Sequence, residues 1–288
     1  MSQPQDDTRQ RVGDRVPRRF WIGAVALVVY ILFAAVLGNI TGSLAPDGDV
    51  TAEFALSHLI PLPIAIGLAL WFTWWSGWWR DVWRNTSTLR MQPRRLWLIA
   101  IPVLLVALPL VQLPGIPWVE RGFGTVMIVL VGTIMVGFGE ELVIRGILFV
   151  SLRKRHGELV TLLVTSLLFG AAHTVGSVWA GLPPAAIAFQ VAALSMTGSL
   201  YYWVRRVTGR LWVGMAIHAL TDFTLYLASG EASAAEAMSS SDDLGSLKPV
   251  LVTIQSLLVA LAIAGVISAA REDHRARKAR RVAADPQV

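Results

Sequence analysis

The stretch GFGEELVIRG, residues 137–146, places three charged side chains inside a run that is otherwise apolar. Glu140, Glu141 and Arg145 lie between VMIVLVGTIMV and ILFV. A charged side chain near the centre of a bilayer costs about 2.5–3.5 kcal/mol, so such residues are rare and usually functional. A carboxylate in this setting can act as a base for water or bind a cation, and the stretch is therefore a candidate site.

Two further apolar runs carry ionisable residues. His173 lies near the end of the run 160–174, and His218 and Asp222 lie in the run 211–228. The other Lys, Arg, Asp, Glu and His residues fall in tails, in loops or close to an expected membrane interface. We therefore expect the three helices to converge on one buried polar site.

Helical spacing assigns different roles to the two glutamates. Glu141 and Arg145 are four residues apart, so they share a helix face and can form an ion pair that lowers the cost of both charges. Glu140 is rotated about 100° from Glu141 on a 3.6-residue period and does not easily reach the same arginine. One carboxylate is thus neutralised locally, and the other is left for another purpose.

The histidines show the same spacing of four. Asp222 can accept an N–H from His218 and fix its tautomer, an arrangement found behind catalytic and metal-bound histidines. Phe169 precedes His173 by four residues, and its ring can form a wall of the site. Each pair alone also has a structural explanation, as an ion pair or an interhelical hydrogen bond. Six ionisable residues on three helices favour a functional site.

The charge balance leaves two explanations open. The three carboxylates and one guanidinium of these motifs leave an excess of negative charge if all ionise, and burying it is costly. A divalent metal such as zinc, bound by Glu140, His173 and His218, would relieve it. Protonation of Glu140 or of the histidines would relieve it equally well. The chain has no cysteine, which excludes disulfides, thiolate ligands and a cysteine nucleophile.

The composition is that of a membrane protein. Of 288 residues, 55% are apolar and 15% are charged, whereas about a quarter are charged in a soluble domain. About 20 apolar residues cross a bilayer as a helix, which satisfies its own backbone hydrogen bonds. We predict an all-α, polytopic membrane helical bundle. Its eight predicted transmembrane helices lie at about 20–38, 55–76, 96–112, 125–150, 160–174, 184–204, 211–228 and 249–269.

The cations predict the topology. If residues 1–19 are cytoplasmic and the chain alternates from there, 22 of the 25 Lys and Arg residues lie in cytoplasmic segments. This positive-inside pattern places both termini in the cytoplasm and explains the net charge of +6 without nucleic acid as a partner. We predict basic tails without fixed structure at 1–19 and 271–288, around a membrane domain at 20–270.

The three motifs resemble those of the CPBP family of intramembrane endopeptidases, also called Abi or CAAX-protease-like. EELVIR matches EExxxR, FGAAH matches FxxxH, and HALTD matches HxxxN/D. They occur in this order on separate predicted helices, and the resemblance covers about residues 125–228. Asp222 stands where the eukaryotic CAAX enzymes of the family carry asparagine, so the local charge differs.

This resemblance implies hydrolysis of a peptide bond within or beside the membrane by an enzyme often classed as a metallopeptidase. Glu140 would activate water, and His173 and His218 would position it, bind a metal or stabilise the oxyanion. Three further residues would support or orient the site: Glu141, Arg145 and Asp222. The expected partners are the lipid bilayer and a membrane-associated protein or peptide substrate. The expected location is the plasma membrane if the source is bacterial.

Two other functions stay open. A non-catalytic membrane regulator or immunity protein would keep the site and act by binding a partner. An ion- or proton-coupled transporter also uses intramembrane Glu, Arg and His, but predicts a polar path across the bilayer and inverted repeats. The side of substrate entry is also open. Glu140 lies roughly 15 Å from the cytoplasmic end of its predicted helix, at about 1.5 Å per residue, which is near mid-membrane.

Overall fold

A computed structural model describes residues 14–90, 93–231 and 247–284. Within these ranges every regular element is helical, apart from one isolated β-bridge between Arg84 and Arg210. The predicted all-α membrane bundle is confirmed. Parts of both predicted tails, 1–13 and 285–288, lie outside the described residues.

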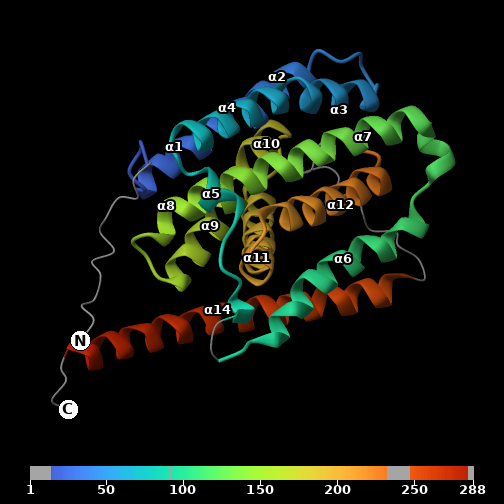
Figure 1. Cartoon of the computed structure of the whole chain (residues 1–288). Helices are drawn as coiled ribbons and strands as arrows, with labels where there is room; N and C mark the ends of the chain where they lie inside the picture. The colour runs from blue at the N-terminus through green and yellow to red at the C-terminus, as the bar shows by residue number, and fades with distance from the viewer. Residues whose placement is uncertain (1–13, 91–92, 232–246, 285–288) are drawn as a thin grey trace.

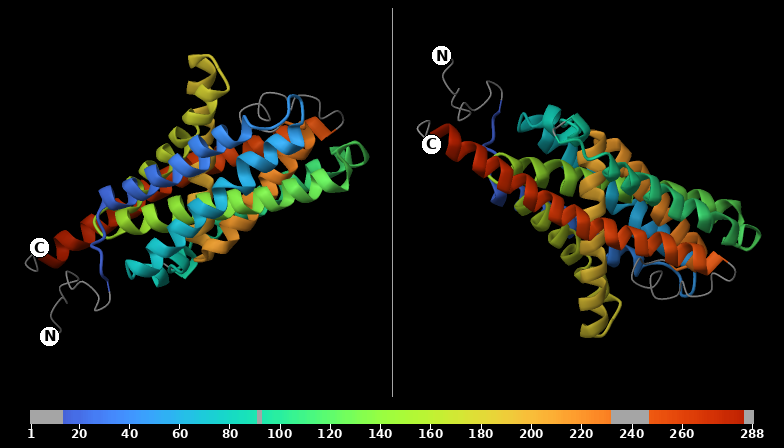
Figure 2. Two further views of the ribbon diagram at one scale, coloured as in Figure 1. Left: turned by 90° about the horizontal axis from the view of Figure 1, so that it is seen from above. Right: turned by 90° about the horizontal axis from the view of Figure 1, so that it is seen from below.

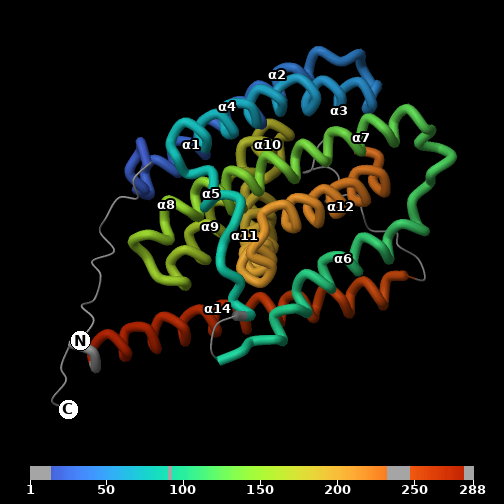
Figure 3. The backbone as a smooth tube through the Cα atoms, in the orientation of Figure 1, coloured from blue at the N-terminus to red at the C-terminus, as the bar shows by residue number. Residues whose placement is uncertain are grey.

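Seven helical segments of the described chain are long and apolar enough to cross a membrane. Short π and 3₁₀ segments interrupt or extend several of them. Figure 3 follows the path of the chain through these segments. In chain order, the first three membrane segments and the elements between them are α1 (Phe20–Ile31), η1 (Leu32–Leu37), α2 (Gly38–Gly42), α3 (Val50–Leu59), α4 (Pro61–Trp75), α5 (Trp79–Trp83), η2 (Thr88–Arg90), η3 (Leu96–Ile99), α6 (Ala100–Gln112) and η4 (Leu113–Gly115).

The second half of the chain contains the motif-bearing helices. These are α7 (Trp118–Glu141), η5 (Leu142–Leu148), α8 (Phe149–Arg153), α9 (Glu158–Ala172), α10 (Thr174–Trp179), α11 (Pro184–Thr208), α12 (Leu211–Ser229) and α14 (Lys248–Ala284). The fourth membrane segment comprises α7, which has a kink at Gly122, followed directly by η5 and α8, and the fifth joins α9 to α10.

Helix α11 differs from the membrane helix predicted at 184–204. It is a single helix of 25 residues, but it is not among the seven apolar spans. Polar residues such as Gln190, Ser199 and Arg205 lower its apolar character. Figure 1 shows α11 nearly end-on where α7, α12 and α14 run across the view, so it crosses them steeply. Figure 2 shows α10 and the first part of α11 projecting from the side of the bundle.

The segments predicted to be cytoplasmic meet at one end of the bundle. Ion pairs join Arg18 to Asp81, Arg95 to Glu272 and Arg206 to Glu158, so they connect the N-terminal segment, three connections and α14. The beginning of α1 and the end of α14 lie at this same end (Figure 1). This agrees with the placement of both termini on one side of the membrane.

The expectation of a tail without fixed structure at 271–288 is wrong for its described part. Helix α14 continues to Ala284, well beyond the apolar stretch. Glu272 pairs with Arg95 at 2.7 Å, and Asp273 accepts backbone N–H groups of Glu158 and Leu159 at 2.7 and 3.1 Å. These two contacts hold the extended helix against the bundle.

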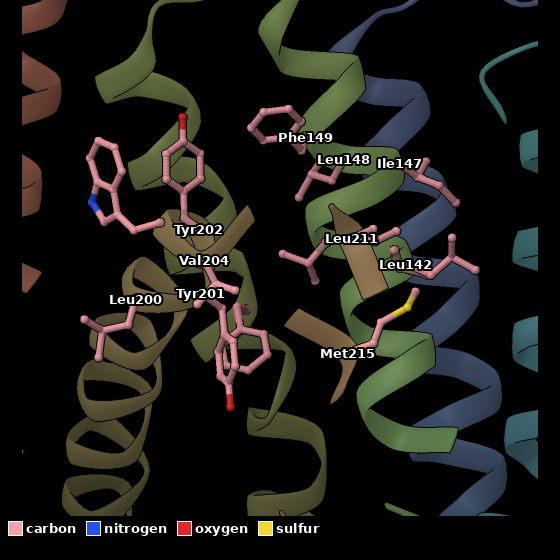
Figure 4. Packing of buried hydrophobic residues seen from close by; sticks show 14 of the residues in the cluster. Leu142, Ile147, Leu148, Phe149, Leu200, Tyr201, Tyr202, Val204, Leu211 and Met215 are labelled. Atoms are coloured by element: carbon pink, nitrogen blue, oxygen red, sulfur yellow. The ribbon is translucent and has the colours of Figure 1, made fainter. Parts of the chain in front are cut away.

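The largest apolar core packs around η5 and α11. Figure 4 shows Leu142, Leu148 and Tyr202 among the side chains that meet there. Helices α7 and α12 approach closely at Gly137, where an added Cβ would lie 2.6 Å from the backbone nitrogen of Ala219. Large apolar side chains remain exposed on α1, α4, α6 and α14, as expected of a surface that faces lipid.

Candidate active site

The first motif lies at an irregular point of its helix. The α-helical segment ends at Glu141, and a π-helical segment, Leu142–Leu148, follows directly. All seven residues of this segment are buried. π-helical turns are rare and are frequently found at functional sites.

The predicted ion pair between Glu141 and Arg145 is present and fully buried. Arg145 Nη1 donates to Glu141 Oε1 at 2.8 Å, and Nη2 donates to the carbonyl of Gly198 in α11 at 3.0 Å. The guanidinium lies over the Phe169 ring, with 4.3 Å from Cζ to the ring centroid. The pair therefore connects the first motif helix to α9 and α11.

His218 has a carboxylate beside each of its ring nitrogens. Its Nδ1 lies 3.3 Å from Glu141 Oε1, while Asp222 Oδ2 lies 3.5 Å from Nε2 on the other side of the ring. Glu141 Oε1 also accepts from Arg145 Nη1, so Nδ1 of His218 is the donor in this contact. Tyr201 stacks on the imidazole with ring centroids 4.8 Å apart and an interplanar angle of 20°.

His173 is fixed by the backbone. It stands at the C-terminal end of α9, where the chain turns into α10. Its Nδ1 lies 2.9 Å from the carbonyl oxygen of Phe169. A carbonyl oxygen only accepts, so Nδ1 carries the proton, and in the neutral ring Nε2 presents a lone pair.

The three motif helices converge as predicted. Glu140 Oε2 lies 3.9 Å from His173 Nε2 and 3.8 Å from His218 Nε2. The side chains of Glu140 and His173 are 21% and 20% exposed, whereas those of Glu141 and Arg145 are 1% and 0% exposed. One carboxylate thus faces open space beside two imidazoles, and its neighbour is enclosed.

A comparison with protein families recognises this part of the chain. A family model described as type II CAAX prenyl endopeptidase Rce1-like matches residues 122–224. This segment is an Rce1-like domain. It contains all three motifs, so the resemblance predicted from them is confirmed. No curated protein and no solved structure matches the chain.

The Rce1-like domain has side chains of the kinds that bind metals, but their donor atoms lie farther apart than the ligands of a bound zinc ion. Zinc ligands lie about 2.0–2.2 Å from the ion in a tetrahedron, which places neighbouring donor atoms roughly 3.3 Å apart. The three candidate ligands are separated by 3.8 and 3.9 Å. Within the described ranges, no group of three or more His, Asp or Glu residues forms a metal site as it stands. The metal therefore stays a prediction.

A cavity of about 260 Å³ adjoins the site of the Rce1-like domain. Glu140 and His173 form part of its wall, and it continues toward Ser43 and Glu53. Ser43 lies in the turn between α2 and α3, and Glu53 lies in the first turn of α3. This end of the bundle is opposite the end where the basic, predicted cytoplasmic segments meet, which we call the basic end (Figure 1). The cavity thus reaches the carboxylate from the half of the bundle away from the basic end.

Several residues that contact the site were not singled out in the sequence. Tyr201 and Tyr202 are adjacent on α11, but their hydroxyl groups point opposite ways (Figure 4), and only the Tyr201 ring lies against His218. Tyr30, on α1 and outside the Rce1-like domain, lines the same cavity as Glu140. A tyrosine hydroxyl inside an apolar run was the available signal for Tyr30.

Proposed function

We propose that this protein is an intramembrane endopeptidase that hydrolyses a peptide bond of a membrane-associated protein or peptide. The observation that carries the proposal is the position of Glu140. Its Oε2 is buried and has no hydrogen-bond partner in the described part of the chain. Two imidazole nitrogens lie just beyond hydrogen-bond distance from it, at the wall of a cavity. The Rce1-like domain supports the same reaction class.

The geometry suits activation of water by a general base. Two atoms 3.8–3.9 Å apart can both contact one water oxygen at about 2.8 Å. Glu140 would remove a proton from this water while the oxygen attacks the scissile carbonyl carbon. The protonated carboxyl would then give the proton to the departing amine nitrogen when the C–N bond breaks. The products are a new carboxyl terminus and a new amino terminus.

The remaining motif residues would hold this centre in place. Glu141 and Arg145 fix η5 against α11 and orient the imidazole of His218. Asp222 faces the outer nitrogen of the same ring and would balance positive charge that develops there. His173 would hold the water from the opposite side.

The decisive measurement compares peptide termini in membranes of cells that express wild type, Glu140→Gln or Glu120→Gln. The control changes an exposed glutamate on the same helix. We expect new termini with wild type and Glu120→Gln, and none with Glu140→Gln at equal expression. Identical termini with Glu140→Gln would contradict a peptidase that uses this base. A cellular phenotype that survives Glu140→Gln would favour a regulator that acts by binding.

A divalent cation bound by Glu140, His173 and His218 is a separate part of the proposal. Bound there, it would polarise water or the scissile carbonyl. The test is dialysis of the purified protein against a strong chelator, followed by metal analysis and an activity assay. With a required metal we expect one equivalent in the active protein and recovery of activity after zinc is restored. Full activity in metal-free protein would refute this part and leave the base mechanism intact.

A further inference from the structure

The reaction calls for more hydrogen-bond donors at the scissile carbonyl than the two histidines can provide. Attack of water on an amide creates negative charge on the carbonyl oxygen, and enzymes stabilise it with donors fixed in advance. His173 carries its proton on Nδ1, facing Phe169, and His218 carries its proton on Nδ1, facing Glu141. His173 therefore turns a lone pair on Nε2 toward Glu140. The Nε2 of His218 instead faces carboxylate oxygens of Asp222 at 3.5 Å and of Glu140 at 3.8 Å, so it is the better placed of the two to carry a proton. The two histidines thus offer the oxyanion at most one donor.

Tyr30 brings a hydroxyl group to this centre from a different part of the chain. It lies on α1, its residue is 6% exposed, and it lines the cavity together with Glu140 and His173. Its hydroxyl oxygen is buried and has no hydrogen-bond partner in the part of the chain that the structure describes. The hydroxyl is within electrostatic range of Glu140 and Asp222.

The residue preceding Glu140 makes room for this hydroxyl. Gly139 lies so close to Tyr30 that an added Cβ would overlap the hydroxyl group and the ring edge. Tyr30 also lines a second, apolar groove between α1 and α4, together with Ala65 and Leu68. The tyrosine thus forms part of the wall of both cavities.

A buried hydroxyl without a hydrogen-bond partner lowers the stability of the folded protein, so its presence suggests a role in function. Leaving a buried donor unsatisfied costs about 1–3 kcal/mol, and phenylalanine would fill the same space without that cost. Transition-state stabilisation requires a hydrogen-bond donor that is free before the reaction. Such a donor can then bond to the negative charge that forms on the carbonyl oxygen.

We propose that Tyr30 is a further catalytic residue, whose O–H donates a hydrogen bond to the oxyanion formed on the scissile carbonyl. The inference rests on the proposed peptidase function. No proton is transferred in this step: the hydroxyl keeps its proton, and the bond is released when the carbonyl re-forms and the amine departs. The Rce1-like domain would then be completed by a residue of α1, outside residues 122–224.

The test uses purified full-length protein and a substrate identified from the new termini. Tyr30→Phe keeps the ring and removes the hydroxyl. We expect kcat to fall about 100- to 1,000-fold, as on removal of one oxyanion donor, with KM changed little. The pH values at which kcat/KM rises and falls should stay the same, and the melting temperature should not decrease. Tyr202→Phe is the matched control, because that buried hydroxyl bonds to Glu158 and lies outside the site.

Three results would overturn the inference. A kcat within about twofold of wild type would show that the hydroxyl does not act in the reaction, as a donor effect is about 100-fold or more. A displaced acidic limb of the pH profile would show that Tyr30 acts by holding Glu140. A melting temperature lowered as much as in Tyr202→Phe would indicate a structural hydroxyl. Glu140→Gln runs in parallel: if that variant stays active, the peptidase mechanism itself fails, and the two failures are distinguished.

Discussion

Two glutamates inside the bundle, on successive membrane segments, have opposite surroundings. Glu158, at the basic end, accepts from Arg206 at 2.6 and 3.1 Å, from the Tyr202 hydroxyl at 2.7 Å and pairs with Arg153 at 3.1 Å. Glu140, in the middle of the bundle, has imidazole nitrogens at 3.8 and 3.9 Å.

The difference separates a structural carboxylate from a reactive one. Each oxygen of Glu158 has partners at hydrogen-bond distance, so its charge is fully compensated, and nothing remains for a ligand. Glu140 has a buried oxygen without such a partner and opens onto a cavity. Burial alone does not identify a catalytic carboxylate; its unsatisfied hydrogen-bonding capacity does.

Exchanging each glutamate for glutamine should separate the two roles most clearly. Glu158→Gln removes the closest counter-charge of the buried Arg206 and leaves it Glu272 at 3.8 Å, so we expect a loss of about 3 kcal/mol in the free energy of unfolding. The cleavage rate per folded molecule should remain near wild type. Glu140→Gln should abolish cleavage without a comparable loss of stability. Denaturant titration in detergent and a cleavage assay measure both properties.

The distinction between a structural Glu158 and a reactive Glu140 would be contradicted if either variant changed both stability and cleavage, or if the two effects were exchanged. Cleavage that falls with Glu158→Gln in molecules that remain folded would show that the basic end takes part in the reaction. A large loss of stability in Glu140→Gln would show that its carboxylate has structural partners, contrary to the distances in the site.

Glu141 stands between the two cases and sharpens the comparison. It is buried and paired like Glu158, but it also contacts His218. Glu141→Gln should therefore lower stability and also reduce kcat by about 10- to 100-fold, as when the partner that orients a catalytic histidine is lost. Denaturant titration and single-turnover cleavage would measure the two losses. A loss of cleavage as complete as in Glu140→Gln would place Glu141 in the chemistry itself.

The local parts of this site were predictable from the sequence. The pairing of Glu141 with Arg145 follows from four-residue spacing on one helix, and charged side chains in apolar runs predicted the convergence on Glu140. These inferences need only helix geometry and the cost of charge in lipid.

The contacts between helices were not predictable in the same way. Glu141 and His218 are 77 positions apart, and their meeting depends on the π-helical turn and on close packing at Gly137. Spacing assigned the orienting role to Asp222, which is near His218 in sequence but beside its other nitrogen in space. Tyr30 reaches the site from the first helix, which carries none of the motifs.

The smallest expected effect concerns the contact between α14 and the start of α9. Gly157 has no side chain to cap α9, and the carboxylate of Asp273 accepts the first N–H groups in its place. A carboxylate at this position also interacts favourably with the helix dipole. Asp273→Asn removes the charge and one acceptor, and we expect a loss of about 1 kcal/mol or less, because the residue is partly exposed.

Asp273→Asn tests whether the contact at the basic end affects only the stability of α9 or also the cleavage reaction at His173. Cleavage per folded molecule should be unchanged, because the cap acts at the opposite end of α9 from the histidine. His274→Ala, at the next and exposed position, serves as the control and should change neither stability nor cleavage. A fall in kcat with Asp273→Asn at unchanged stability would instead mean that α14 controls the position of His173 through α9. The basic end and the catalytic centre would then be one coupled unit, and the separation between Glu158 and Glu140 would no longer hold.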